Sequence, residues 1–456
     1  MSNRLRALYL GLATVTTLGV PAIATPASAV DLTVSCRCVE GGANSNDAVW
    51  IKTKVIPAFT EKMKADGKDV TVTLNEFGGT DEQFTQQLAL DFSTGAGSDV
   101  SGFDGFLVPS FVEGGLLKPL DEVAGADVDT WEGWSHISDG VKALMSYSGK
   151  AYGIAKGTDV RMIFTRKDLL EKAGLPADWQ PKTWAELLDA ARKLKESGVE
   201  FPLQLNAGVA MGEATTMQGY WMALLGTGEQ VTDENGKFIV SSQGILDTLN
   251  LYKTIYVDEG LGDQRAQLLA DGRNQSFANF RDGKTALLVE GDYFWRSVTT
   301  PGAEFGLANR DEVVGWAKMP AEEPGKGLRG QDFVTISGGT GFVLNPATKN
   351  PAEAWALLSF MNSADMLNEF QTIQPAIRAR DDVAIPNSEF LTTTSQTLLP
   401  LTTARPNDPN YNKVSAEIQR MTESVVSGEL SPEDAMAQYK NAVIAIVGED
   451  NTVSTL

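Results

Sequence analysis

The sequence predicts an α/β fold in which strands and helices alternate along the chain. Segments with the period-two pattern of strands lie next to segments with helical spacing of apolar residues, and this order favours a largely parallel sheet covered by helices. The 456 residues suffice for two or three domains, and 42% hydrophobic with 21% charged residues is an ordinary globular composition. Helix-capping patterns mark where several helices begin. No internal repeat or long linker interrupts the chain, so we expect the domains to be interwoven.

The first four elements are predicted to be strand, helix, strand and helix. Residues 31–36 and 70–74 alternate apolar and polar side chains, which indicates two strands. Between them, Asn46 or Asp47 can cap a helix that runs through Trp50. The order of these elements is typical of an α/β sheet.

Further capping patterns place helices along the rest of the chain. Residues 80–83 (Thr-Asp-Glu-Gln) and 183–186 (Thr-Trp-Ala-Glu) are capping boxes that precede apolar positions at helical spacing. Residues 350–353 and 431–434 each combine a capping residue, a proline and an acid, which predicts two more helix starts. Pro386, Asn387 and the threonines at 392–394 indicate a polar loop between the last helical segments.

The N-terminal segment is predicted to be a signal peptide covering residues 1–29. Arg4 and Arg6 form a positive region, residues 7–23 are apolar and uncharged, and Ala27-Ser28-Ala29 has the small-x-small form of a cleavage site. The apolar stretch is too short and too rich in threonine for a membrane anchor. We therefore expect an exported protein, periplasmic or extracellular and associated with the cell surface. A lipid anchor on Cys36 is an alternative that the weak preceding box disfavours.

Composition excludes several classes of function. The 59 acidic residues against 38 basic ones give a net charge of −21, which disfavours nucleic-acid binding. His136 is the single histidine, which disfavours a hydrolase with a catalytic histidine and a histidine-rich zinc site. Cys36 and Cys38 form a C-x-C pair, for which two buried thiols are favoured over a short-loop disulfide.

Two short motifs suggest catalysis only weakly. Residues 283–285 (Gly-Lys-Thr) resemble the end of a phosphate-binding loop, but the first glycine is missing and the apolar strand follows rather than precedes. Glu290 and Asp292 could be the two carboxylates of a glycosidase, although their spacing around Gly291 fits a strand end better.

Aromatic residues beside glycine and acidic residues favour a carbohydrate ligand. A sugar offers C–H faces for ring stacking and hydroxyls for carboxylate, amide and arginine partners. Most of these rings are expected in the core, whereas Tyr293, Phe294 and Trp295 after Gly291 are predicted to contact a ligand. The aromatic residues with this setting are Trp131, Trp134, Tyr152, Tyr220, Trp221, Tyr293, Phe294, Trp295, Trp316 and Phe333.

Four sequence blocks carry a family resemblance over most of the chain. They are residues 99–104 with 114–121, residues 149–161 with 165–184, residues 280–295, and residues 338–361. The second block is the most specific, with Gly-Lys-Ala-Tyr-Gly-Ile-Ala at 149–155 and Thr-Asp-Val-Arg at 158–161. In this order the blocks resemble the extracellular solute-binding proteins of ABC sugar importers, the family that contains maltose-binding protein.

The resemblance implies a two-lobe periplasmic-binding-protein fold of type II, with the ligand in a cleft between the lobes. Lobe 1 is expected to contain residues 30–154 and 289–340, and lobe 2 residues 155–288 and 341–456. Crossing strands are expected near residues 154–158, 288–291 and 340–343. The implied protein is a monomer without cofactor or metal, closes around a di- or oligosaccharide, and is recognised by an ABC permease.

The resemblance also implies a set of ligand-binding residues. Tyr293 and Trp295 would stack on sugar rings, and glycine backbone would approach the ligand closely. The carboxylates and Arg161 would bond hydroxyl groups. The full set is Glu40, Asp104, Thr158, Asp159, Arg161, Trp221, Glu290, Asp292, Tyr293, Trp295, Gly338, Gly339 and Thr340.

Three alternative functions remain open at this point. An acidic cleft could take a polyamine or another cationic solute. A secreted glycosidase would need two carboxylates about 5–9.5 Å apart across the sugar. A surface adhesin would expose an apolar patch.

Overall fold

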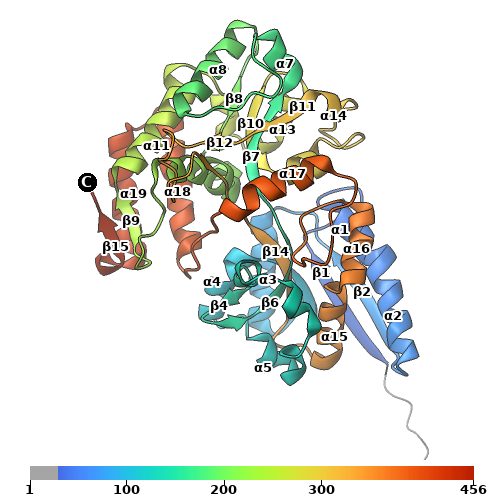
Figure 1. Ribbon diagram of the computed structural model, residues 1–456. Helices are drawn as coiled ribbons and strands as arrows, with labels where there is room; N and C mark the ends of the chain where they lie inside the picture. The colour runs from blue at the N-terminus through green and yellow to red at the C-terminus, as the bar shows by residue number, and fades with distance from the viewer. Residues whose placement is uncertain (1–28) are drawn as a thin grey trace, which may run out of the picture.

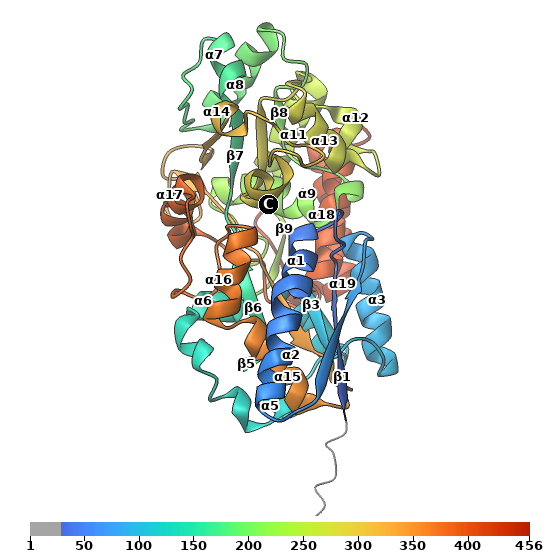
Figure 2. The ribbon, with the colours of Figure 1, turned by 90° about the vertical axis from the view of Figure 1, so that its right-hand side faces the viewer.

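The computed structural model describes residues 29–456, which fold into two lobes, one above the other in Figure 1. The chain starts in the lower lobe, called the first lobe here. The upper or second lobe contains the middle of the chain and its C-terminal helices, and Figure 2 shows the same division from the side. Apart from Ala29, the predicted signal peptide lies outside the described residues. No helix within residues 29–456 is long and apolar enough to cross a membrane.

The first lobe is built on a five-stranded sheet with the order β2-β1-β3-β14-β6. Its strands are β1 (Val30–Cys36), β2 (Val70–Glu76), β3 (Val100–Asp104), β6 (Gly153–Thr158) and β14 (Gly339–Leu344). β1 pairs in parallel with β2 and β3, whereas β14 pairs antiparallel with β3 and β6. Leu32 and Val34 alternate with less buried residues along β1, so the predicted period-two strand is confirmed.

The second lobe is built on a four-stranded sheet with the order β11-β7-β10-β8. Its strands are β7 (Arg161–Arg166), β8 (Leu203–Gln204), β10 (Leu287–Gly291) and β11 (Val314–Ala317). Every residue of β7 and β10 is buried, as in strands that are covered on both faces. Short strand pairs complete the fold: β4 (Ser146–Tyr147) with β5 (Lys150–Ala151), β12 (Met319–Pro320) with β13 (Phe333–Val334), and β9 (Phe238–Ser241) with β15 (Thr452–Ser454).

Helices cover the two sheets (Figures 1 and 2). Those of the first lobe are α1 (Ser45–Trp50), α2 (Ile56–Ala65), α3 (Asp81–Thr94), α4 (Val108–Glu113), α5 (Leu120–Ala124), α6 (Asp139–Ala143), α15 (Pro351–Met361) and α16 (Ala364–Ile373). Those of the second lobe are α7 (Lys167–Lys172), α8 (Trp184–Glu196), α9 (Glu213–Thr215), α10 (Trp221–Leu224), α11 (Gln243–Lys253), α12 (Gln264–Gln267), α13 (Gly272–Arg281), α14 (Arg310–Val313), α17 (Glu389–Leu398), α18 (Tyr411–Val426) and α19 (Pro432–Val447).

Most predicted helix starts are confirmed, but the cap predicted at Asn46 or Asp47 is wrong, because both residues lie inside α1, which begins at Ser45. Thr80 and Gln83 form a complete capping box at α3, and the side chains of Thr183 and Ser431 cap α8 and α19. The predicted polar loop is confirmed at residues 386–387, which precede α17, but is wrong at residues 392–394, because these threonines lie within α17. The buried face of α17 there outweighs the modest helix propensity of threonine.

The strand pairing corrects the predicted division into lobes. β10 lies inside the second sheet, where it pairs with β7 and β8, and is not a crossing strand. β14 belongs entirely to the first sheet, so the expected boundary at residue 340 is also wrong. The chain passes to the second lobe between β6 and β7, returns between β13 and β14, and passes again between α16 and α17. Periodicity cannot separate a buried central strand from a buried crossing strand.

Cys36 and Cys38 are joined by a disulfide, with Cα atoms 5.2 Å apart. This corrects the expectation of two free thiols. Both residues are buried at the end of β1, and the carbonyls of both accept hydrogen bonds from the Phe77 backbone N–H. The disulfide thereby fixes the turn that follows β1.

Candidate functional site

The two lobes meet where β3 of the first lobe ends opposite the start of α9 in the second. Asp104 is the last residue of β3 and Glu213 is the first of α9. Arg405, in the segment between α17 and α18, donates to Asp104 Oδ1 at 2.8 Å and to Glu213 Oε2 at 3.1 Å. The Arg405 side chain is only 8% exposed. One guanidinium therefore links carboxylates from both lobes.

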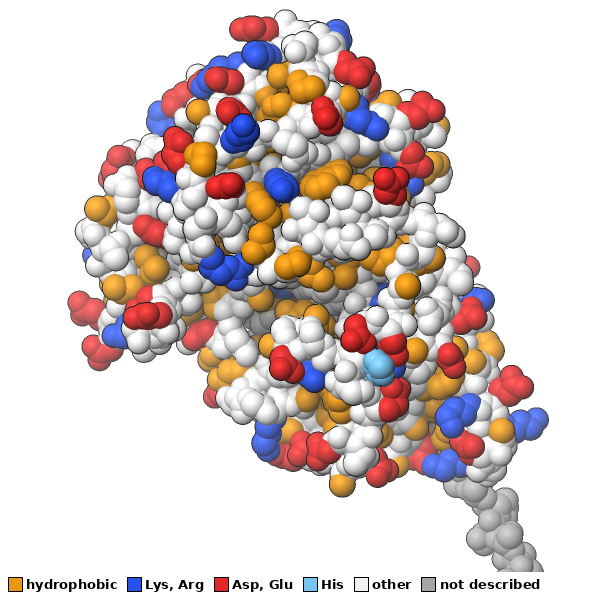
Figure 3. All heavy atoms as spheres, viewed as in Figure 1, with side chains coloured by type: hydrophobic (Ala, Val, Ile, Leu, Met, Phe, Trp, Pro, Cys, Tyr) orange, Lys and Arg blue, Asp and Glu red, His pale blue; other side chains and the backbone are white. Residues whose placement is uncertain are grey.

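Aromatic rings extend this contact. The guanidinium carbon of Arg405 lies 3.9 Å from the centre of the Phe106 ring, a cation–π distance. Phe106 in turn meets Tyr411 edge to face, and Tyr411 lies beside Trp221. Aromatic surface and charged groups thus lie together at the lobe interface, where Figure 3 shows a hollow between the lobes.

The environment of Asp104 changes its acidity. Burial raises the pKa of Asp104 to about 6, and the nearby carboxylates of Asp81 and Glu213 act in the same direction. Arg405 and the backbone N–H of Phe106 oppose this rise. The carboxyl group of Asp104 therefore titrates close to neutral pH.

The crossing segments bring together four of the predicted site residues. Arg161 Nη1 donates to Asp159 Oδ1 at 2.7 Å, and the Gly338 backbone N–H donates to the same oxygen at 2.6 Å. Thr158 donates its hydroxyl to the Gly338 carbonyl at 2.9 Å. These bonds tie the strand that leaves the first lobe to the one that returns. The four residues lie together, and their polar groups bond one another.

Glu290 and Asp292 are fully buried in the second lobe. Glu290 accepts hydrogen bonds from Arg273 at 3.1 and 3.2 Å and from the Tyr293 hydroxyl. Asp292 Oδ2 accepts from Arg296 at 3.1 Å. Each carboxylate is paired with its own arginine and neither is exposed to solvent. This placement differs from the expected bonding of ligand hydroxyls and from the exposed carboxylate pair that a glycosidase needs.

The predicted aromatic residues occupy different settings. Trp295 stacks on Phe390 with ring centres 4.8 Å apart, and Arg310 lies 3.8 Å from its centre, so the protein itself supplies both ring contacts. Trp221 is 2% exposed and its indole N–H has no hydrogen-bond partner among the described residues. Tyr293 is half-buried, and its hydroxyl bonds Glu290 and Gln218. A stacking role for Trp295 is therefore not available in this arrangement.

The remaining predicted residues lie at the ends of two central strands of the first sheet, β1 and β14. Glu40 is exposed after β1 and forms an ion pair with Lys52. Thr340 is exposed, whereas Gly339 is buried. A Cβ on Gly339 would come within 2.3 Å of the Leu144 side chain, so glycine there is needed for packing.

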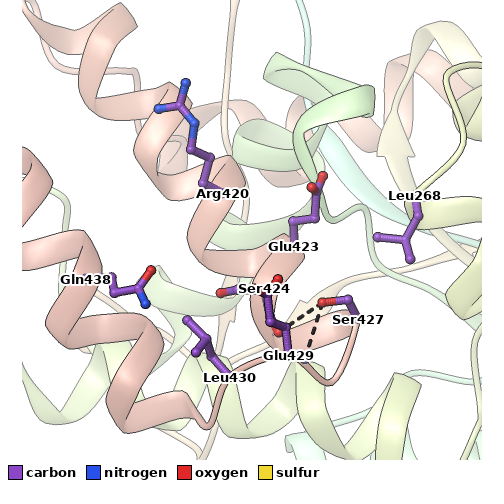
Figure 4. Close-up of a pocket in the computed structure, with 8 residues that line it drawn as sticks. All are labelled: Leu268, Arg420, Glu423, Ser424, Ser427, Glu429, Leu430 and Gln438. Carbon is purple, nitrogen blue, oxygen red and sulfur yellow. Dashed lines mark hydrogen bonds between the residues drawn. The ribbon is translucent and has the colours of Figure 1, made fainter.

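Cavities elsewhere do not coincide with the lobe interface. A hollow of about 430 Å³ lies beside α18 and α19 in the second lobe (Figure 4). It is lined by Leu268, Arg420, Glu423, Ser424, Ser427, Glu429, Leu430 and Gln438. Another of about 250 Å³ lies in the first lobe beside Trp134. Within residues 29–456, His136, Asp381 and Asp382 form one group of potential metal ligands, and the two aspartates lie in the segment that passes from the first lobe to the second.

Residues 43–367 match the family model of the bacterial extracellular solute-binding proteins. The chain belongs to this family. A Brucella abortus (strain 2308) protein described as a candidate binding protein is 26% identical over 393 residues, which cover 83% of this chain and 87% of that protein. Being a solute-binding protein, the chain is not an enzyme. The family prediction made from the four sequence blocks is confirmed.

Solved structures confirm the two-lobe fold. An ABC transporter solute-binding protein of Thermotoga lettingae TMO, bound with α-D-tagatose, has a TM-score of 0.77 and 24% identity, covering 92% of this chain and 100% of that chain. Maltose-bound MalE3 of T. maritima has a TM-score of 0.75 and 21% identity, with the same coverage. At these identities the similarity establishes the fold.

Two arginines of this solute-binding protein that pair with predicted site residues were not predicted from the sequence. Arg405 lies 301 residues from Asp104 and 192 residues from Glu213, and no local motif marks it. Arg273, the partner of Glu290, follows a glycine in an ordinary helix start. Both arginines gain their carboxylate partners only because the fold brings distant segments together. A sequence without aligned relatives carries no signal for such pairs.

Proposed function

We propose that this protein is the substrate-binding component of an ABC importer and captures a neutral carbohydrate, most simply a di- or oligosaccharide, between its lobes. The closed form then delivers the sugar to membrane permease subunits. The protein acts as a monomer outside the cytoplasmic membrane, periplasmic or at the cell surface, after removal of the signal peptide.

The observation that carries this proposal is the charge balance of the predicted site residues. Asp159 is paired with Arg161, and the buried carboxylates of Glu290 and Asp292 are paired with Arg273 and Arg296. A polyamine site needs carboxylates whose charge is left for the ligand, because a buried cation without a counter-charge is costly.

Around Arg405 the balance is also nearly complete. Asp104 and Glu213 share the one guanidinium, which leaves a single negative charge that is reduced further when Asp104 takes up a proton near pH 6. The residues that remain accessible there combine a half-buried carboxylate with the half-buried ring of Phe106. Hydroxyl groups and the C–H faces of a sugar fit this mixture of hydrogen-bond acceptors and aromatic surface.

Structural neighbours support the same ligand class. Proteins of this fold include complexes with tagatose, maltose and ribitol, all of them neutral and rich in hydroxyl groups. These proteins share at most 24% of their sequence with this chain, so the particular sugar has to be found by experiment.

Thermal denaturation of the mature protein against neutral sugars and polyamines tests the proposal. A ligand at about 100 times its dissociation constant adds about 2.7 kcal/mol to the free energy of unfolding, which raises the melting temperature by a few degrees. We expect a shift with one class of neutral sugar, and unchanged sugar after prolonged incubation. A shift with a polyamine alone would overturn the ligand assignment while leaving the two-lobe binding fold intact.

A further inference from the structure

We propose that Arg405 is an interlobe clasp, which holds the first lobe against the second and so sets how much of the protein is closed at any ligand concentration. The clasp consists of Arg405 with its first-lobe partners Asp104 and Phe106. It acts on the opening equilibrium itself and does not depend on which solute the protein carries.

The clasp joins two separate bodies. Arg405 follows α17, whose Phe390 packs against Phe164 of the second sheet, and it precedes α18, which packs in the second core. Asp104 and Phe106, in contrast, continue directly from β3 of the first sheet. The Arg405–Asp104 bond therefore breaks whenever the lobes separate at this edge.

Glu213 holds the guanidinium in place for this contact. It belongs to the same lobe as Arg405 and accepts its second hydrogen bond at 3.1 Å. Glu213 is itself fixed, because it also accepts bonds from Ser415 and from the Tyr411 hydroxyl. A side chain that is already immobilised loses little conformational freedom when it binds Asp104. The clasp is thus preorganised on the second lobe.

Neighbouring residues extend the same contact across the interface. Asn412 donates to the Ser110 hydroxyl at 3.1 Å, and Asn407 donates to the Ser146 carbonyl at the same distance. The segment that carries Arg405 therefore meets the first lobe at several places. Among these contacts with the first lobe, the one made by Arg405 is charged, and the Arg405 side chain is more than nine-tenths buried.

The clasp predicts a defined effect on binding. Only the closed form surrounds the solute, so its population scales the apparent affinity. A charge-assisted hydrogen bond in a shielded setting changes an equilibrium about tenfold or more. Removing it should therefore open the ligand-free protein and weaken apparent solute affinity by about tenfold.

Small-angle X-ray scattering of the ligand-free protein tests the clasp. We expect the Arg405→Gln variant to have a larger radius of gyration than wild type. The Asp104→Asn variant, which changes a half-buried residue and so places little demand on folding, should show the same expansion. Arg166→Gln is the matched control, because the carboxylate partner of this buried arginine, Asp168, lies in the same lobe. It should leave the radius unchanged.

The outcomes separate the clasp from the choice of ligand, because the scattering needs no solute. Circular dichroism establishes that each variant is folded. Wild-type radii for both Arg405→Gln and Asp104→Asn, or equal expansion in Arg166→Gln, would overturn the proposal.

Discussion

Glu290→Gln is expected to destabilise the second lobe strongly. Glu290 is fully buried and accepts hydrogen bonds from Arg273, from Tyr293 and from the Gly291 backbone N–H. The amide has the same shape but no charge, so Arg273 loses its counter-ion. Removing one partner of a buried ion pair costs about 3–5 kcal/mol. Because the Arg273 side chain is 33% exposed and can recover some hydration, we expect the lower end, about 3 kcal/mol.

A loss of about 3 kcal/mol should lower the melting temperature by about 6–12 °C, at roughly 2–4 °C per kcal/mol for a domain of this size. Differential scanning calorimetry measures it directly. Glu259→Gln is the matched control, since Glu259 accepts two bonds from Arg192 with the same chemistry but at the surface. An exposed pair contributes about 1 kcal/mol or less. Equal shifts for the two variants would refute the view that Glu290 is a buried structural partner of Arg273.

Three further predictions follow from single contacts. Trp295→Ala should lower the melting temperature, because the ring packs on Phe390, yet leave solute affinity within about twofold; a tenfold loss in a calorimetric titration would instead mark a ligand contact. Burial raises the pKa of Asp104 to about 6, whereas the unfolded value is near 3.8. The ionised carboxylate therefore lowers the free energy of unfolding above pH 6, and this loss is recovered progressively as the pH falls below 6. The melting temperature of wild type should thus rise relative to Asp104→Asn between pH 7.5 and 5, and a pH-independent difference would contradict this assignment. Replacing Cys36 and Cys38 together by serine should destabilise the turn after β1, read as faster amide exchange there, whereas unchanged exchange would show that the disulfide does not order the turn.

Local signals in the sequence were reliable because they rest on neighbouring residues. The capping box at Thr80 and Gln83 specifies a helix start without help from the rest of the chain. The alternation in residues 31–36 likewise needs only one buried face to produce a strand. The order of such elements along the chain predicts the fold class, and the four sequence blocks predict the family.

Non-local features could not be predicted in the same way. The run at 287–291 is apolar and buried, but its place inside the second sheet depends on pairing with β7, more than a hundred residues earlier. The neighbours of Trp295 in sequence predicted a ligand contact, whereas in the structure its ring packs against Phe390 and Arg310. The interlobe contact of Arg405 could not be predicted, because its partners come from distant segments of the chain.

The most direct test of carbohydrate capture by lobe closure is small-angle scattering with and without the sugar that gives the largest thermal shift. The account predicts that saturation with this sugar reduces the radius of gyration, as the lobes close on it. An unchanged radius at saturation, or the absence of a shift with every neutral sugar, would contradict it.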